Sequence, residues 1–136
     1  MVEIHKKEIT IEDKHIDYNG HVNNVNFVQW MQDIAIDHSD VNVPADFYPS
    51  HNTTWFAVSH TINYKNQAFL GDVVEAYTWI SEIKNSSSTR KYRFINKENG
   101  KILAEALTNW VYIDQKTGRP KRIDEDLQQY YRAVEN

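Results

Sequence analysis

The residues best suited to chemistry lie together in the run Asp17-Tyr18-Asn19-Gly20-His21-Val22-Asn23-Asn24. This run sets a carboxylate, an amide and an imidazole at every second position, on Asp17, Asn19 and His21. A carboxylate can attack a carbonyl or activate water, an imidazole can move the proton, and an amide can orient either group. The run therefore indicates hydrolytic or acyl-transfer chemistry, although an ordinary turn before a helix uses the same residue types.

The segment after this run has helical periodicity over residues 23–38 and must position the reactive groups. Its apolar residues recur at spacings of three and four, at Phe27, Val28, Met31, Ile34 and Ala35. Trp30 and Ile36 widen the apolar stripe, which predicts a helix buried on most sides. Asn23 or Asn24 is expected to cap its N-terminus.

The start of this helix is also expected to act on a substrate. Its unpaired N–H groups and positive dipole end can hold a developing oxyanion, and Gly20 lets the backbone approach a substrate closely.

The remaining segments predict strands over residues 3–11, 56–64, 73–83, 89–96 and 102–113, and a C-terminal helix over 124–133. Asn99-Gly100 is a strong hairpin signal between the last two strands. We expect the four strands after the long helix to be linked by consecutive hairpins. The economical fold is of the α+β class, a curved antiparallel sheet wrapped around one long central helix, with residues 1–136 forming a single domain.

Composition excludes several classes of function. The chain of 136 residues has 15 Lys and Arg against 19 Asp and Glu, a net charge of −4 that argues against a nucleic-acid partner. It has no cysteine, which excludes disulfides, thiolate nucleophiles and iron–sulfur clusters. No apolar run has the length of a signal peptide or membrane span, so we expect a cytoplasmic protein with no membrane partner.

A metal site is the first rival interpretation of the motif. His15, Asp17 and His21 are three possible ligands in one short segment. However, no second cluster supplies a further ligand, so we expect neither a metal nor another cofactor.

The run from Asp17 to Trp30, DYNGHVNNVNFVQW, resembles the signature of hotdog-fold thioesterases. In detail it is similar to the Asp-x-Asn-x-His-Val-Asn-Asn pattern of plant and bacterial acyl-carrier-protein thioesterases. The resemblance continues through residues 56–64, 68–72 and 116–120, so it covers most of the chain. It implies the hotdog fold, with Asp17, Asn19 and His21 as catalytic residues. In the related 4-hydroxybenzoyl-CoA thioesterases a backbone N–H at the start of the central helix polarises the thioester carbonyl, and Asn24 holds the matching position.

The resemblance also implies an activity and an assembly. We expect hydrolysis of an acyl-CoA or acyl-carrier-protein thioester by a homodimer or a dimer of dimers. Contacts to the oxyanion or the substrate are expected from Gly20, Val22, Asn24 and His60.

One departure from the plant enzymes is visible, because Gln67-Ala68 stands where they carry an acidic residue followed by Cys. This departure puts the details of the plant mechanism in question. Two alternatives stay open: a non-catalytic acyl-binding or regulatory module, and a dehydratase or hydratase of the same fold.

Two further groups allow more than one interpretation. His60 is expected on the strand face of Phe56, Val58 and Ile62, either as a core histidine or as a polar group lining an acyl pocket. Arg90, Lys91 and Arg93 either steer a phosphate group or form a solvated face.

Overall fold

The computed structural model describes residues 1–134 of the chain. Strand β1 (Ile4–Thr10) is followed by a short 3₁₀ helix, η1 (Asp13–His15), and by the long helix α1 (Val25–Asn42). Helix α2 (Phe47–His51) then leads into four strands, β2 (Thr53–Tyr64), β3 (Val73–Ile83), β4 (Ser87–Asn96) and β5 (Ile102–Asp114), and helix α3 (Glu125–Gln128) comes last. The predicted strands and the long helix are confirmed.

The predicted C-terminal helix over residues 124–133 is wrong in length, because α3 ends at Gln128. Beyond it the chain makes tertiary contacts instead of helical ones. The Tyr131 hydroxyl lies 2.8 Å from the Tyr48 hydroxyl, and the Val134 N–H donates to the Ile80 carbonyl over 2.8 Å. None of the helices within residues 1–134 combines the length and the apolar character needed to cross a membrane.

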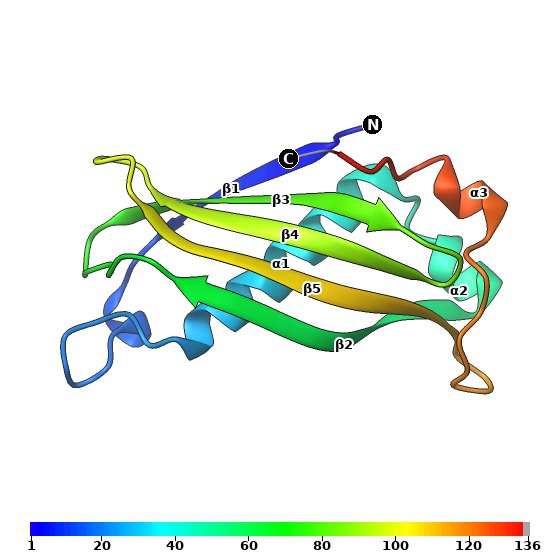
Figure 1. The fold of residues 1–136 in the computed structure, drawn as a ribbon, viewed down its shortest axis with the longest axis horizontal. Helices are drawn as coiled ribbons and strands as arrows, with labels where there is room; N and C mark the ends of the chain where they lie inside the picture. Colours follow the sequence, from blue (N-terminus) through cyan, green and yellow to red (C-terminus); the bar gives the residue numbers. More distant parts are fainter. Residues whose placement is uncertain (135–136) are drawn as a thin grey trace.

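All five strands form one antiparallel sheet in the order β1-β3-β4-β5-β2 (Figure 1). The hairpins β3–β4 and β4–β5 are as predicted. The expected hairpin from β2 to β3 is wrong, because β2 pairs with the far edge of β5, from Thr53 opposite Asp114 to Tyr64 opposite Ala104. Residues 65–72 therefore connect two strands that are not neighbours. This topology makes β1 and β2 the edge strands.

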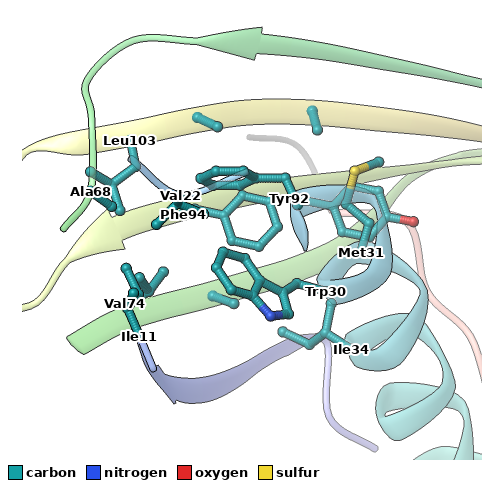
Figure 2. Packing of buried hydrophobic residues seen from close by; sticks show 14 of the residues in the cluster. Ile11, Val22, Trp30, Met31, Ile34, Ala68, Val74, Tyr92, Phe94 and Leu103 are labelled. Carbon is teal, nitrogen blue, oxygen red and sulfur yellow. The ribbon is translucent and has the colours of Figure 1, made fainter. Parts of the chain in front are cut away.

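Helix α1 packs one face against this sheet (Figure 1). Trp30, Met31 and Ile34 of the helix pack among strand residues such as Val74 and Phe94 (Figure 2). The opposite face is open: Ile36 is 59% exposed and Val41 is 56% exposed. The expectation of a helix buried on most sides is therefore wrong for the isolated chain, since a single sheet covers only one side of a helix.

A β-bulge changes the orientation of side chains in the middle of β2. The register against β5 shifts between Ala57 and Ser59, and Val58 is the extra residue. One extra residue moves every later side chain to the other face of the strand. As a result His60 is half-buried, whereas Phe56 and Val58 are 60% and 59% exposed. The predicted common face for these three residues is wrong for this reason.

Candidate active site

The predicted motif forms the loop before α1, at the end of the molecule where the β2–β3 connection and the β4–β5 hairpin also lie (Figure 1). These three segments surround a cavity of about 970 Å³. Five predicted site residues line it, namely Asp17, Asn19, His21, Val22 and Asn24. Gly20 and His60 are not among its lining residues. The fold therefore brings most of the predicted site to one cavity.

The backbone of its own loop holds the Asp17 carboxylate in place. Oδ1 of Asp17 accepts hydrogen bonds from the N–H groups of Asn19 at 2.9 Å and His21 at 3.2 Å. The loop closes through the Asp17 N–H, which donates to the His21 carbonyl at 2.9 Å, and through Gly20, whose φ of +79° favours glycine. Oδ2 of Asp17 has no hydrogen-bond partner within residues 1–134. One carboxylate oxygen is thus anchored and the other is available to a ligand.

The start of α1 leaves one backbone donor unused. Asn24 is the N-cap residue, but the capping oxygen is Oδ1 of Asn23, which accepts from the Val25 N–H at 3.1 Å. The Gly20 N–H donates to the Asp17 carbonyl at 3.0 Å, and the Val22 N–H donates to the Ala68 carbonyl at 3.4 Å. The Asn24 N–H donates to no acceptor in the described part of the chain. Among the predicted oxyanion positions, Asn24 is therefore the one with a free donor at the helix N-terminus.

His21 and Asn19 share the cavity with Asp17 without bonding to it through their side chains. The His21 ring is half-buried and packs edge-on against Phe69, with ring centroids 5.9 Å apart. Neither the ring nitrogens of His21 nor the amide of Asn19 has a hydrogen-bond partner between residues 1 and 134. Both side chains are thus free to contact a bound substrate.

His15 does not line this cavity, and its contacts hold the loop in place. Its Nδ1 accepts from the Glu12 N–H at 2.9 Å, and its ring packs edge-on against Trp30 with centroids 5.4 Å apart. Its carbonyl accepts from the Asn23 N–H and from the Asn26 amide, both at 2.9 Å. His15 therefore fastens the loop to α1 and does not converge with Asp17 and His21. Within residues 1–134, three metal-ligand side chains converge only at His51, Asp124 and Asp126, far along the chain from this loop.

Several cavity residues were missed by the sequence reasoning, namely Tyr64, Lys65, Asn66 and Lys101. The Lys65 and Asn66 N–H groups donate to the Leu103 carbonyl at 2.8 and 3.2 Å, which fastens the β2–β3 connection beside the start of β5. This contact exists because β2 pairs with β5, and local sequence carries no signal for that pairing. Burial also raises the pKa of the Tyr64 phenol, whose ring packs edge-on against Phe27.

His60 lies further along β2, away from the motif. Its Nδ1 is 2.8 Å from the Thr108 hydroxyl, which also accepts a hydrogen bond from the Tyr92 hydroxyl at 3.0 Å. Thr108 and Tyr92 are buried in the sheet, so this imidazole is tied to the core by one nitrogen. Substrate binding by His60 stays a prediction.

Comparison with known proteins identifies the family and the fold. A model of the thioesterase-like superfamily matches residues 10–130. The long-chain acyl-CoA thioesterase FadM of Escherichia coli (strain K12) is 23% identical over 122 residues, which are 90% of this chain and 92% of FadM.

Two solved structures share the architecture. The 12:0-ACP thioesterase from Umbellularia californica superposes with a TM-score of 0.85 at 16% identity, over 93% of this chain and 49% of that chain. Slr0204, a 1,4-dihydroxy-2-naphthoyl-CoA thioesterase from Synechocystis, gives 0.83 at 16% identity, over 93% of this chain and 94% of that chain. These likenesses confirm the expected α+β hotdog fold. Since the family model covers nearly all of the 136 residues, the chain belongs to the thioesterase-like superfamily.

Proposed function

We propose that this protein is an acyl thioesterase that hydrolyses acyl-CoA thioesters. One observation carries the proposal: the free Oδ2 of Asp17 and the unused N–H of Asn24 belong to the same cavity wall, at the start of a helix. A thioester carbonyl has weak resonance and a good leaving group. A positioned carboxylate and an aimed backbone donor can therefore suffice for its hydrolysis.

The proposed reaction gives one role to each of three groups: the Asn24 N–H, the Asp17 carboxylate and the His21 imidazole. The carbonyl oxygen accepts from the Asn24 N–H, where the helix dipole stabilises the negative charge that develops. Asp17 removes a proton from water, and the water oxygen attacks the carbonyl carbon to give a tetrahedral intermediate. The intermediate collapses with cleavage of the C–S bond, and His21 supplies the proton that the thiolate takes up. The proton that Asp17 took from water then passes through solvent to His21, which restores both groups.

A nucleophilic variant of this mechanism uses the same residues. In it, Asp17 attacks the carbonyl directly, the thiolate leaves, and water then hydrolyses the mixed anhydride. A single turnover in H₂¹⁸O detects this route when water attacks the aspartyl carbon of the anhydride, because ¹⁸O then enters the Asp17 carboxylate, whereas direct attack of water on the thioester places all of the ¹⁸O in the product acid.

The charges of the cavity support CoA as the carrier. Lys65 and Lys101 line it, and neither ammonium group has a carboxylate within 4 Å among the described residues. Cations without partners suit the phosphates of CoA. Gln67 also lines this cavity, so the position of the plant-type acidic residue carries no charge here. FadM, a long-chain acyl-CoA thioesterase, matches this chain over almost its whole length.

We further propose a homodimer, or a dimer of dimers, formed through the edge of β2. This edge strand is 12 residues long and exposes Phe56 and Val58. A long apolar edge strand is a template for pairing with another chain. Sedimentation of the wild type and of Val58→Lys tests this, and a fully active wild-type monomer at assay concentration would contradict it.

A panel of acyl-CoA thioesters, with release of free thiol as the signal, tests the activity. We expect the wild type and Asp13→Asn to hydrolyse a subset of the panel at similar rates, and Asp17→Asn to be strongly impaired. Asp13→Asn is a matched control because it removes the same charge from a residue close to Asp17 in the sequence. Asp13 does not line the cavity. No thiol release from any member would overturn the proposal, and an enoyl-CoA hydration assay would then separate a hydratase from a binding module.

A further inference from the structure

A second cavity, of about 310 Å³, lies at the other end of α1, between its C-terminal half and the sheet. Its walls are largely apolar and aromatic and include Ile36, Trp55, Ile80 and Trp110. None of its lining residues is shared with the cavity of the candidate active site. Its volume falls at the lower end of the range for small-molecule sites, about 300–1,000 Å³.

Arg90 of β4 brings a positive charge to the wall of this cavity. The residue is 5% exposed, and its Nη1 donates to Nδ1 of His38 at 2.8 Å and to the Thr78 hydroxyl at 3.1 Å. Both partners are neutral at pH 7, since burial lowers the pKa of His38 to about 4. No carboxylate of residues 1–134 lies within 4 Å of the guanidinium, and Nε and Nη2 donate to no acceptor there.

This arrangement is unusual for a purely structural arginine. Burying a charge is costly unless an opposite charge accompanies it. The earlier interpretation of Arg90 as part of a solvated face is wrong, because its side chain points to the core side of β4.

The other polar groups of the cavity wall are mainly hydroxyls. The Tyr131 hydroxyl lies 2.8 Å from that of Tyr48 and 3.1 Å from that of Ser39. One positive charge, several neutral donors and apolar walls match a ligand with one negative charge and an apolar body. A phosphate dianion would leave a second charge uncompensated.

We propose that this cavity binds an apolar carboxylate, with its carboxylate group on the Arg90 guanidinium and its chain between α1 and the sheet. Binding of a free carboxylate here does not depend on the thioesterase activity, whereas a carboxylate that belongs to a substrate rests on the proposed function. Two molecules offer this chemistry: a free fatty acid, and an acyl thioester with a second carboxylate at the far end of its chain.

Calorimetric titration with three probes tests the charge and the chain separately. Decanoate has both, decanol has the chain alone and acetate has the charge alone. We expect decanoate to bind at one site per chain and at least about tenfold more tightly than decanol, with no detectable binding of acetate. Equal affinity for decanoate and decanol would overturn the proposal.

Variants locate the binding. Arg90→Met is expected to weaken decanoate binding at least about tenfold, to the level of decanol. Arg93→Met is the matched control on the opposite face of β4, and Asp17→Asn excludes binding at the active-site cavity; both should bind decanoate like the wild type. Ile36→Trp fills the cavity from an exposed position, so it tests the site even if Arg90→Met does not fold, and it should abolish binding. Wild-type affinity in a folded Arg90→Met, or in Ile36→Trp, would overturn the proposal.

Kinetics separate the two sources of the carboxylate. If it belongs to a substrate, the KM for ω-carboxydecanoyl-CoA should be lower than that for decanoyl-CoA, and Arg90→Met should remove the difference. If it belongs to a free acid, the two KM values should agree while decanoate still binds.

Discussion

The two ends of helix α1 use polar residues in opposite ways. At the N-terminal end, Asp17, His21 and Asn24 line an open cavity and keep one or more hydrogen-bonding groups free. At the C-terminal end, His38 is 2% exposed and engaged on both nitrogens, by Arg90 at 2.8 Å and by the Val2 carbonyl at 2.6 Å. One end is open to a substrate, while the other fastens β4 and the N-terminal segment to the helix.

This difference separates activity from stability along a single element. A free polar group in an accessible cavity costs little, because water satisfies it until a ligand arrives. A polar group in the core must be satisfied by the protein, and its loss is destabilising. Substitutions at the first end should therefore change rates, and substitutions at the second end should change the free energy of unfolding.

The largest effect is expected for Asp17→Asn, with a fall in kcat/KM of about a thousandfold. The amide oxygen can still accept from the Asn19 and His21 N–H groups, so the melting temperature should change little. Asp17→Ala should lose both activity and stability, because those two donors lose their acceptor. Turnover within about threefold of the wild type in Asp17→Asn would remove Asp17 from the mechanism.

The next effect concerns stability in acid and arises at His38. The pKa of His38 is lowered from 6.5 to about 4, first by burial and then by the nearby charge of Arg90 and by His5. The unfolded chain therefore binds a proton that the folded chain excludes, and stability falls as the pH drops from about 6.5 towards 4. The full loss is about 3 kcal/mol.

Denaturant titrations at pH 7, 5.5 and 4 measure this loss. His38→Gln removes the titrating group while its amide can still donate to the Val2 carbonyl, so its unfolding free energy should depend less steeply on pH. An identical pH dependence in the wild type and the variant would show that other groups cause the acid sensitivity.

His21→Ala should act on the rate instead, with a fall in kcat/KM of about a hundredfold. If His21 supplies the proton to the thiolate, the pH–rate profile of the variant should differ in shape from that of the wild type. Its melting temperature should stay close to that of the wild type, since its ring nitrogens hold no other described residue. A fall in stability with an unchanged pH–rate profile would assign His21 a structural role.

The smallest effect distinguishes two neighbouring residues at the start of α1. Asn23→Ala should lower the free energy of unfolding by about 1 kcal/mol, because Oδ1 of Asn23 caps the Val25 N–H. Asn24→Ala should change it by less than about 0.5 kcal/mol, since its side chain makes no capping bond. Equal losses in the two variants would contradict this assignment of the cap.

Local sequence was sufficient for the five strands, for the long helix α1 and for the core of the candidate site. The strands and α1 follow from side-chain periodicity, and the β4–β5 hairpin follows from Asn99-Gly100. The loop from Asp17 to Asn24 also has a local explanation, because its carboxylate, its glycine and its backbone close it within a few residues. Short-range hydrogen bonds and backbone preferences depend on residues that are close together in the sequence. This segment could therefore be identified from its residues.

Tertiary structure alone decided which distant segments meet. The pairing of β2 with β5 brings Lys65 and Lys101 to one cavity, the bulge at Val58 turns His60 to the other face, and burial under α1 leaves Arg90 without a carboxylate. Each of these outcomes depends on strand order and packing between residues far apart in the chain. A strand's own sequence shows that one face is apolar, but only its neighbours in space determine which face is covered and which charge is left without a partner.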